Sequence, residues 1–417
     1  MDIRRPMTGF NCSSGLLRAA AAVGVCIATT VVGVAPVMAA PRCAASAEVV
    51  RWAPAPYPTT RRVLQVGPQR TYRTLKDVAE AARDGDIIEI DAGEYTESVL
   101  FKADDLWLRG VGGRPHLKAP AKLFLDKAIL VFRGRNPTIE NLEFSGARAK
   151  ARNGAGIRHQ HGNLTIRHSL FRDSDNGILT SHDPEGVVVI EFSEFARNGF
   201  GDGKSHNIYV GRVGRFELRH SYSHGAKEGH LVKSRAAENL IEHNWLVDDV
   251  DGRTSYEIDI VFPGETLIVG NVIAQAASSP NQSIVSYAAG KERSTTPTGR
   301  LTVAYNTIFN SRKNPVYVNN NSTGTALVLN NVFGGPRGKE DMRGPVDARG
   351  NVTLDTSAFV AAERGDFRLV AGAKAIDAGV PVDVPVPGFE PSGQLSSTPR
   401  PSDGQPDAGA LEHCLDR

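Results

Sequence analysis

The sequence has few cysteines and no excess of charge of either sign. Its 417 residues include 4 cysteines and 3 tryptophans, with 48 basic side chains against 46 acidic ones. Residues 1–40 hold three of the basic residues and one of the acids, so the remainder carries 45 of each. Proteins that bind nucleic acid normally have a basic excess, and we therefore expect no nucleic-acid partner. Recognition of any charged ligand must come from a local patch.

Long apolar runs are also missing, except at the N-terminus. There, three arginines precede an Ala- and Gly-rich stretch (19–35), and small residues follow at Ala39 and Ala40. This pattern is typical of an export signal, and the small residues at its end favour cleavage over a retained membrane anchor. We expect residues 1–40 to be a signal peptide and the mature protein to be periplasmic or extracellular. We also expect it to be a monomer without membrane contact after cleavage.

The sequence does contain a short pattern that recurs along the chain. An apolar strand ends in Asn or Ser, a few polar residues follow, and a second apolar strand begins. The closing residues are Asn141, Ser169, Ser193, Ser221, Asn244, Asn271, Asn306 and Asn331, which lie 28, 24, 28, 23, 27, 35 and 25 residues apart. Short strands with a period in the twenties, and no helical pattern between them, predict a stacked β-solenoid.

Two cysteines remain after the predicted cleavage, Cys43 and Cys414, one near each end. In an exported protein such a pair suggests a disulfide; the alternative is two free or intermolecular thiols. Coils stacked about 4.8 Å apart would separate the ends by roughly 40 Å. A bridge would need a tail that runs back along the stack.

One amphipathic segment precedes the repeats. The apolar residues of 75–82 share one helical face, and Thr74 with Asp77 three residues later resembles an N-cap. A helix here would cover the open apolar end of the first coil, as capping units of solenoids do.

Both ends of the repeat region resemble a known fold family. The motifs are Gly85-Asp86-Ile87-Ile88 with Ala92-Gly93-Glu94-Tyr95, and Pro406-Asp407-Ala408-Gly409-Ala410 near the other end. Over most of residues 63–412 the chain resembles right-handed parallel β-helix proteins of the pectin-lyase-like superfamily. The resemblance implies an all-β, single-stranded right-handed parallel β-helix (solenoid) with an N-terminal capping helix. It implies no single activity, because this superfamily includes lyases, hydrolases, epimerases and inert adhesins.

Composition divides the chain into four segments. Residues 1–40 are the predicted signal peptide, and 41–62 form a Pro- and Ala-rich extended segment. Residues 63–379 are predicted to form the β-helix, and 380–417 a Pro/Gly-rich C-terminal tail. We expect one solenoid domain, whose core grows along one axis.

Alignment of the second strand of each coil predicts which side chains share the exposed face. The residues aligned as pointing inward are Ile178, Ile208, Leu231, Ile258, Ile284 and Val316. Their neighbours then point outward, because side chains alternate across a strand. One outward column would contain Asn207, His230, Glu257 and Ser283. A second would contain Tyr209, Val232, Asp259, Val285 and Tyr317.

Polar side chains are densest between residues 202 and 259, in three successive coils. One part of this region, Glu228-Gly229-His230-Leu231-Val232-Lys233-Ser234 with Arg253 in the next coil, is similar to the catalytic region of alginate and chondroitin lyases of this fold. The resemblance implies that Glu228 binds calcium, Lys233 removes a proton and Arg253 supports it. The sequence departs from that family's pattern, because it lacks a second acid near the first and an Arg-His-Gly motif around the arginine.

β-Elimination from a uronic acid explains why such residues would be needed. The substrate carboxylate must be neutralised, by Ca²⁺ or by an arginine, so that the adjacent carbon can lose a proton. A base with a lowered pKa and a donor to the leaving oxygen complete the set. The predicted catalytic residues are Lys233, Arg253, His230 and Tyr256. The predicted substrate-binding residues are His206, Asn207, Tyr209, Arg235 and Lys204. The predicted Ca²⁺ ligands are Glu228, Glu257 and Asp259.

Two other interpretations remain open. Hydrolysis would use paired carboxylates, and Glu257 with Asp259 would lie about 7 Å apart on one strand face. Charged residues on an exposed sheet are also ordinary, which favours a solvated face without chemistry. We therefore expect a polysaccharide partner, and we favour a lyase that cleaves an acidic (uronic-acid) glycan by β-elimination. The alternative is a non-catalytic glycan-binding or surface-structural solenoid.

Overall fold

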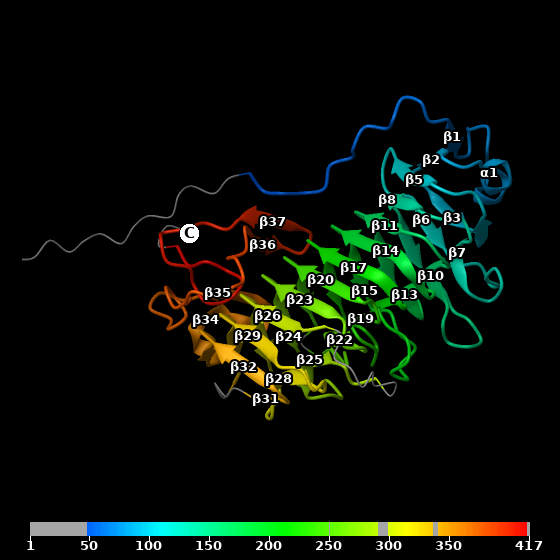
Figure 1. The fold of residues 1–417 in the computed structure, drawn as a ribbon. Helices are drawn as coiled ribbons and strands as arrows, with labels where there is room; N and C mark the ends of the chain where they lie inside the picture. Colours follow the sequence, from blue (N-terminus) through cyan, green and yellow to red (C-terminus); the bar gives the residue numbers. More distant parts are fainter. Residues whose placement is uncertain (1–47, 250, 291–298, 337–340, 415–417) are drawn as a thin grey trace, which may run out of the picture. The chain divides into compact units, whose positions relative to one another are not determined.

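The computed structural model describes residues 48–249, 251–290, 299–336 and 341–414. The chain winds into a stack of coils, and each coil adds one strand to each of three parallel sheets (Figure 1). In the described residues these sheets have 12, 11 and 10 strands, named here sheets I, II and III in the order in which a coil visits them. The predicted right-handed parallel β-helix is confirmed.

The strands of sheet I are β1 (Val63–Val66), β2 (Ile87–Asp91), β5 (Trp107–Val111), β8 (Thr138–Glu140), β11 (Leu164–Arg167), β14 (Asp183–Glu191), β17 (Val213–Arg219), β20 (Glu238–Glu242), β23 (Glu265–Val269), β26 (Leu301–Ala304), β29 (Ala326–Leu329) and β32 (Val346–Arg349). Those of sheet II are β3 (Glu94–Thr96), β6 (His116–Lys118), β9 (Glu143–Ser145), β12 (Leu170–Arg172), β15 (Glu194–Ala196), β18 (Tyr222–His224), β21 (Trp245–Val247), β24 (Val272–Gln275), β27 (Thr307–Asn310), β30 (Val332–Gly334) and β33 (Val352–Leu354). Those of sheet III are β4 (Val99–Phe101), β7 (Ala128–Phe132), β10 (Ala155–His159), β13 (Asn176–Thr180), β16 (Ile208–Val210), β19 (Val232–Ser234), β22 (Ile258–Ile260), β25 (Ser283–Tyr287), β28 (Val316–Asn320) and β31 (Met342–Arg343).

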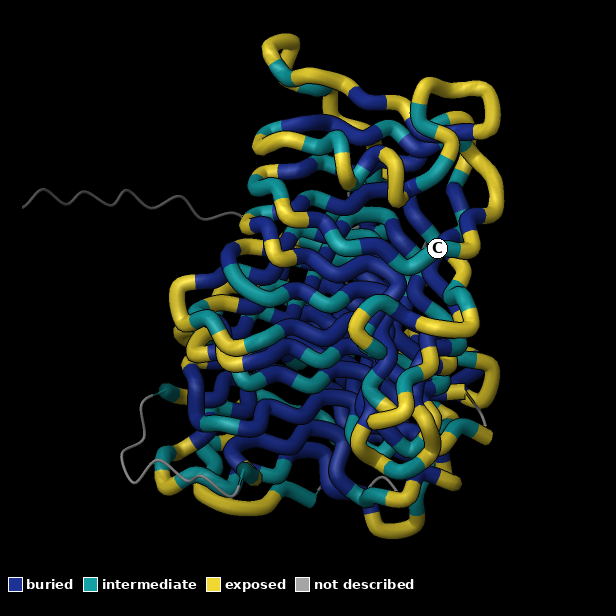
Figure 2. Tube along the Cα trace, turned by 90° about the vertical axis from the view of Figure 1, so that its right-hand side faces the viewer, coloured by how far each residue is buried: buried dark blue, intermediate teal, exposed yellow. Residues whose placement is uncertain are grey.

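Side chains of one kind stack along the interior of the coils. In sheet I the inward column from Leu64 to Val328 is Leu, Ile or Val at every rung, and none is more than 6% exposed. In sheet II, Phe171 stacks on Phe144 at 4.7 Å and on Phe195 at 4.8 Å between ring centroids. Figure 2 shows the buried positions along the middle of the stack and the exposed ones at the turns. Each coil thus buries its apolar residues against the next one.

A polar ladder fills the corner between sheets I and II. At each corner a buried Ser or Asn oxygen accepts the backbone N–H of the equivalent residue one coil earlier, over 2.9–3.3 Å. The ladder residues are Ser169, Ser193, Ser221, Asn244, Asn271, Asn306, Asn331 and Asn351. Most of the recurring Asn and Ser positions of the sequence are therefore rungs of one ladder. Asn141 is not, because it takes the left-handed conformation (φ 54°) one residue before the rung.

The first coil is covered by the predicted helix, α1 (Leu75–Ala81). The Thr74 side chain accepts the backbone N–H of Asp77 over 3.0 Å, which is the N-cap expected from the sequence. Leu75 and Val78 are buried against the coil below. Among the described residues, no helix has the length and apolar character needed to cross a bilayer. The predicted signal peptide, residues 1–40, lies outside the described part of the chain.

The segment before β1 runs back along the stack. Val50 pairs with Ser397 near the C-terminus, Trp52 stacks on His168 at 4.4 Å, and Tyr57 packs edge-on against Trp107 in β5 (Figure 1). This segment, 48–62, is the kind of returning tail that a link between the chain ends requires. Cys414 is buried and disulfide-bonded, whereas Cys43 lies outside the described residues.

The parallel coils end at β33, and the C-terminal residues fold back on the stack. The elements here are η1 (Thr356–Ala358), β34 (Phe359–Ala361), η2 (Ala362–Arg364), β35 (Asp366–Leu369), β36 (Phe389–Gly393) and β37 (Ser396–Pro399). β34 pairs with β35 and β36 with β37, both antiparallel. The region predicted as a tail thus contains a hairpin, β36–β37, in addition to loops.

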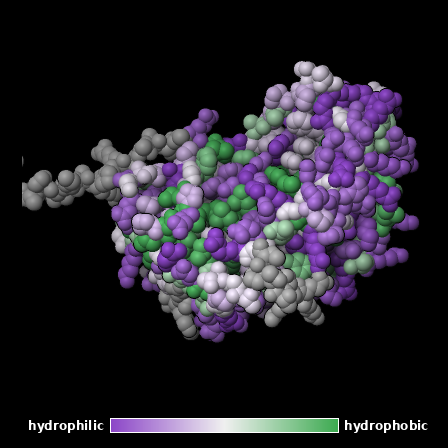
Figure 3. All heavy atoms as spheres, viewed as in Figure 1, coloured by the Kyte–Doolittle hydropathy of each residue, from purple (hydrophilic) through white to green (hydrophobic). Residues whose placement is uncertain are grey.

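Charge changes along the outward face of sheet I. An alternating ladder of ion pairs lies on the earlier coils: Arg109, Glu140, Arg167, Glu191, Arg219 and Glu242. The later coils instead carry buried Val269, Ala304 and Leu329 in this column, and half-buried Leu267, Val382 and Val384 are among the residues that pack against this cluster. In Figure 3, hydrophilic residues cover the N-terminal half of the visible face and hydrophobic residues gather over the C-terminal half.

The ladder predicts a large loss of stability when one rung is removed. Asn271 is fully buried, and its amide group serves both the backbone N–H of Asn244 and two carbonyl oxygens. We expect Asn271→Ala to lower the free energy of unfolding by about 2–4 kcal/mol, because these buried groups lose their partners. Asn319→Ala, on a half-buried outward position of β28, is the matched control and should cost less than about 0.5 kcal/mol. Equal losses in urea titrations of the two variants would contradict the role of the ladder.

Buried histidines predict a loss of stability in acid. His243 stacks on His220 at 5.5 Å, and burial lowers the pKa of His243 to about 3 and that of His220 to about 4. In the unfolded chain the value is about 6.5, so the unfolded state binds more protons below that pH. The stabilisation is complete above about pH 6.5 and is lost as the pH falls toward the folded values.

We therefore expect the Tm to fall between pH 7 and pH 4, and to fall less in His243→Phe. The equivalent position one further coil back, Phe192, already holds a phenylalanine with the same left-handed backbone (φ 49°), so the ring should be accepted. Calorimetry of both proteins across this range checks the expectation. An identical drop in the variant would show that His243 does not contribute.

Candidate functional site

The pairing of the strands changes the predicted outward columns. Ile208 lies opposite Val232 rather than Leu231, and Ile258 lies opposite Val285 rather than Ile284. The predicted alignment is therefore wrong by one residue in β19 and β25. Both places have two successive apolar residues next to a corner, where both can be buried, so alternation alone does not select the register.

The observed outward column on sheet III brings Tyr209, Lys233 and Asp259 together from three successive coils. The Lys233 Nζ lies 3.8 Å from Asp259 Oδ2 and 5.4 Å from the ring centroid of Tyr209. The side chains of Lys233 and Asp259 are only 17% and 9% exposed. Val232, predicted for this column, is inward and fully buried instead. The shift of one residue thus places an amine at the centre of the face.

A stack of rings lies beside this column, and His206 at its start is fully buried. His206 stacks on His230 at 4.4 Å, and His230 lies 5.0 Å from Tyr256 between ring centroids. The backbone N–H of Tyr256 donates to His230 Nδ1 over 3.3 Å, so a neutral His230 carries its hydrogen on Nε2. That nitrogen lies 3.4 Å from Asp259 Oδ2. His230 and Lys233 therefore approach the same carboxylate oxygen.

Burial moves these groups toward their neutral forms. Burial lowers the pKa of Lys233, and nearby Arg235 lowers it further, while Asp259 acts in the opposite direction. Burial likewise holds the pKa of His230 well below its ordinary value and raises that of Asp259. A lysine in this environment is a better candidate for a general base than an exposed one, because more of it is neutral near pH 7.

A basic groove adjoins this group. Its volume is about 540 Å³, and Tyr209, Lys204 and Arg235 line it together with Arg158 and Arg212. No acidic side chain lies among the described residues that line it. The Arg235 guanidinium lies 5.6 Å from the Tyr209 ring, and its buried Nε has no hydrogen-bond partner in the described residues. Such a groove attracts anionic groups, because its described lining includes Arg158, Lys204 and Arg235 and no acidic side chain.

Asn207 and Glu257, like His206, are fully buried instead of exposed on this face. Asn207 is fully buried, and its amide donates to Phe195 O, Ser223 Oγ and His224 O. Glu257 is also fully buried and accepts from Gln275 Nε2 over 2.9 Å. Burial, with Asp248 nearby, holds the pKa of Glu257 well above its ordinary value. The predicted outward column of Asn207, His230, Glu257 and Ser283 does not form, so Glu257 and Asp259 do not share an outward face.

The three predicted calcium ligands lie in three different environments. Asp259 faces Lys233, Glu257 is fully buried, and Glu228 forms an ion pair with Arg253 on the turn before β19. No group of three or more His, Cys, Asp or Glu side chains in the described residues is arranged to hold a metal ion. Glu228, Glu257 and Asp259 therefore do not come together as one calcium site in the described part of the chain. The side chain of Arg253 is 63% exposed and forms its ion pair with Glu228, away from Lys233.

The sequence reasoning missed part of the groove. Arg158 lies in the same outward column as Lys233, three rungs earlier, and Arg212 follows β16. Burial lowers the pKa of Arg158, whose guanidinium donates to Ser181 Oγ over 3.1 Å. The alignment of second strands began one coil too late to include Arg158. Extending it by one coil would have placed this arginine on the face.

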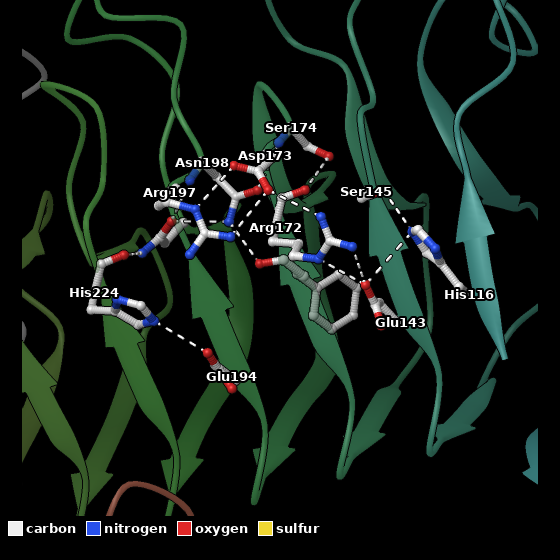
Figure 4. A network of polar contacts seen from close by, with 12 residues as sticks. His116, Glu143, Ser145, Arg172, Asp173, Ser174, Glu194, Arg197, Asn198 and His224 are labelled. Carbon is white, nitrogen blue, oxygen red and sulfur yellow. Dashed lines mark hydrogen bonds and ion pairs between the residues drawn. The ribbon is translucent and has the colours of Figure 1, made fainter. Parts of the chain in front are cut away.

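Charged residues on sheet II have a different arrangement. Figure 4 shows His116, Glu143, Arg172, Asp173 and Arg197 joined in one network on its outward side. Acids and bases alternate there, so each charge has a partner of the opposite sign. The charges on sheet II pair with one another, as expected for a solvated face without chemistry. The groove on sheet III differs, because no acid lies among its described lining residues.

Comparisons with known proteins give the fold but no family. No family model matches this sequence, and no curated protein matches it. Among solved structures it is similar to the pectate lyase Pel9A, with a TM-score of 0.57 and 15% identity over 85% of this chain and 97% of that chain. A pectin methylesterase from Aspergillus niger has a TM-score of 0.31 and 12% identity over 75% of this chain and 89% of that chain. At 15% identity the likeness to Pel9A shows the fold alone, a parallel β-helix.

The separation of the three acids predicts that calcium does not stabilise the protein. We expect the Tm of the mature chain to be the same in excess Ca²⁺ and after treatment with a chelator, because a bound ion would raise it by mass action. Differential scanning calorimetry checks this expectation. A Tm that rises with Ca²⁺, and no longer does so in Glu228→Gln, would instead support the calcium role that the lyase resemblance implies.

Proposed function

We propose that the protein is an exported polysaccharide lyase that cleaves an acidic, uronic-acid-containing glycan by β-elimination. One observation carries this proposal: a largely buried lysine with a lowered pKa stands beside a groove whose described lining includes Arg158, Lys204 and Arg235 and no acid. The groove attracts a polyanion, and the lysine provides a base at its edge. The β-helix fold supports the same class of ligand, because its flat stacked strands offer a long face to a polymer.

Each residue of the group has a role in such a reaction. Arg235 would pair with the substrate carboxylate and favour loss of the proton on the adjacent carbon. Lys233 Nζ would accept that proton, and the C–O bond to the leaving sugar would break as the double bond forms. Tyr209 or Tyr256 would donate a proton to the leaving oxygen. His206 is fully buried, which favours a role beneath the site rather than against the substrate.

Asp259 and His230 would position the base. Asp259 Oδ2 lies between the other two groups, 3.8 Å from Lys233 Nζ and 3.4 Å from His230 Nε2. In this role the carboxylate would hold the amine at the edge of the groove, and burial lowers the pKa of the amine. Hydrolysis is less well supported, because Glu257 is fully buried and leaves Asp259 without a carboxylate partner on the face.

A binding protein without catalysis is the second candidate. The observation that favours it is the Lys233–Asp259 ion pair itself, because paired charges stack as structural ladders on sheets I and II of this same protein. In that case the groove would hold an acidic glycan, and Lys233 would only form a structural ion pair with Asp259.

Lys233 distinguishes the two candidates. We expect Lys233→Ala to lower kcat on a uronic-acid polymer by on the order of 10²- to 10⁴-fold with little change in KM, because a base acts mainly in the transition state. The assay follows the ultraviolet absorbance of the unsaturated product over a panel of uronic-acid polymers. Lys204→Ala, which removes a groove lysine away from the pair, is the matched control and should affect kcat much less.

The other outcomes are equally informative. A less stable but active Lys233→Ala protein would remove the lyase assignment, and binding of polymers without product would favour the non-catalytic candidate. New reducing ends without the absorbance would point to hydrolysis. If Arg253→Ala lost activity as strongly as Lys233→Ala, the supporting arginine would be Arg253, as the lyase resemblance implies, in place of Arg235.

A further inference from the structure

A second hollow lies on sheet II, away from the basic groove. Two adjoining cavities of about 530 and 620 Å³ lie between the outward face of this sheet and the C-terminal residues. Trp245, Arg364, Gly365 and Gly393 line both, and we call the pair the sheet II trough. Cavities of this size accommodate one or a few sugar residues, in the range of ordinary small-molecule sites.

The floor of the trough is aromatic. The charged network of Figure 4 occupies the earlier coils of sheet II and extends to Glu194 and His224. The residue that follows Glu194 in its column is Tyr222, in the same strand as His224, and the next is Trp245 in β21. Phe309 also lines the trough, and Phe367 lies 6.3 Å from Trp245 between ring centroids.

Trp245 differs from the other two tryptophans of the chain. Trp52 stacks on His168, and Trp107 packs against Tyr57, so both hold the returning N-terminal segment. Trp245 is half-buried and borders both cavities. Packing of the C-terminal residues explains the buried part of this apolar floor, but it leaves the part that borders the trough uncovered.

The rim has the opposite charge to the basic groove. Asp249 and Glu363 line the trough, with Arg364 as its cation on this side, and the side chain of Asp249 is 52% exposed. An anionic polymer that the groove attracts would be disfavoured here. Carboxylates, an amide from Gln394 and a guanidinium around an aromatic floor are suited to hydroxyl groups.

We propose that the sheet II trough is a second carbohydrate-binding site, which takes an uncharged sugar residue with its apolar C–H face against Trp245. A pyranose ring has an apolar face and a polar hydroxyl edge, and the trough offers an aromatic floor and a polar rim to match them. This inference is independent of the chemistry at Lys233, because the two sites use different residues on different sheets.

The direct test observes the indole N–H groups of the three tryptophans by NMR in the mature protein labelled with ¹⁵N-tryptophan. The probes are cellohexaose, xylohexaose and mannohexaose, with an oligogalacturonate as the anionic comparison. We expect at least one neutral probe to shift the Trp245 resonance and to leave those of Trp52 and Trp107 in place. Single Trp→Phe variants assign the three resonances. The oligogalacturonate should leave the Trp245 resonance unchanged.

Two variants measure the contribution of the trough. Trp245→Ala should weaken binding of the neutral probe by at least about tenfold, as expected for a central aromatic contact. Asp249→Asn, on the exposed rim, should weaken it severalfold without a change in Tm, and Asp347→Asn on sheet I is its matched control. If Trp245→Ala does not fold, the NMR shifts and Asp249→Asn still decide.

Several results would overturn the proposal. One is a Trp245 resonance that does not shift with any neutral probe up to about 10 mM, the upper end of weak specific binding. Another is unchanged binding of the neutral probe in both trough variants. Preferential binding of the oligogalacturonate at Trp245 would overturn the assignment to an uncharged sugar. Failure here would leave the lyase assay unaffected, and loss of the lyase assignment would leave this titration unaffected.

Discussion

The corner between sheets I and II is the constraint on which the rest of the structure depends. Each coil turns there with its backbone buried, and a buried N–H without a partner would cost about 1–3 kcal/mol. The Ser and Asn oxygens of the ladder supply that partner at each rung from Ser169 to Asn351. Every coil must therefore place this corner directly above the previous one. The longest interval, 35 residues between Asn271 and Asn306, is absorbed after β25 instead of at this corner.

Stacking of this kind also builds the candidate site. Residues about 25 positions apart in the chain become neighbours one rung apart, so Tyr209, Lys233 and Asp259 form one column. Since the rungs are close and the side chains are long, each of these groups is largely buried by its neighbours. Burial then lowers the pKa of the amine and raises that of the carboxyl group. The reactive character proposed for Lys233 is thus a property of three coils together.

The outward faces of the three sheets use charge in different ways. On sheets I and II, acids and bases alternate along the rungs and neutralise one another. The groove on sheet III collects Arg158, Arg235 and other cations without an acid among its described lining residues. The sheet II trough combines an aromatic floor with acids on its rim. Under the two proposals, the groove and the trough would engage two chemically different parts of one polysaccharide material.

The coil and its period follow from the sequence alone, because the apolar strands and the Ser or Asn rungs recur where the backbone needs them. The capping helix follows from it too, through Thr74 and Asp77. The register of sheet III depends on the tertiary structure, because Leu231-Val232 and Ile284-Val285 each offer two apolar residues for one inward position, and the observed choice places Lys233 in the outward column. Asn207 and Glu257 precede β16 and β22, so strand alternation does not apply to them, and both are buried. Pairing between neighbouring coils makes the choice of register. It joins residues that are far apart in the chain, so the pattern within one strand does not reveal it.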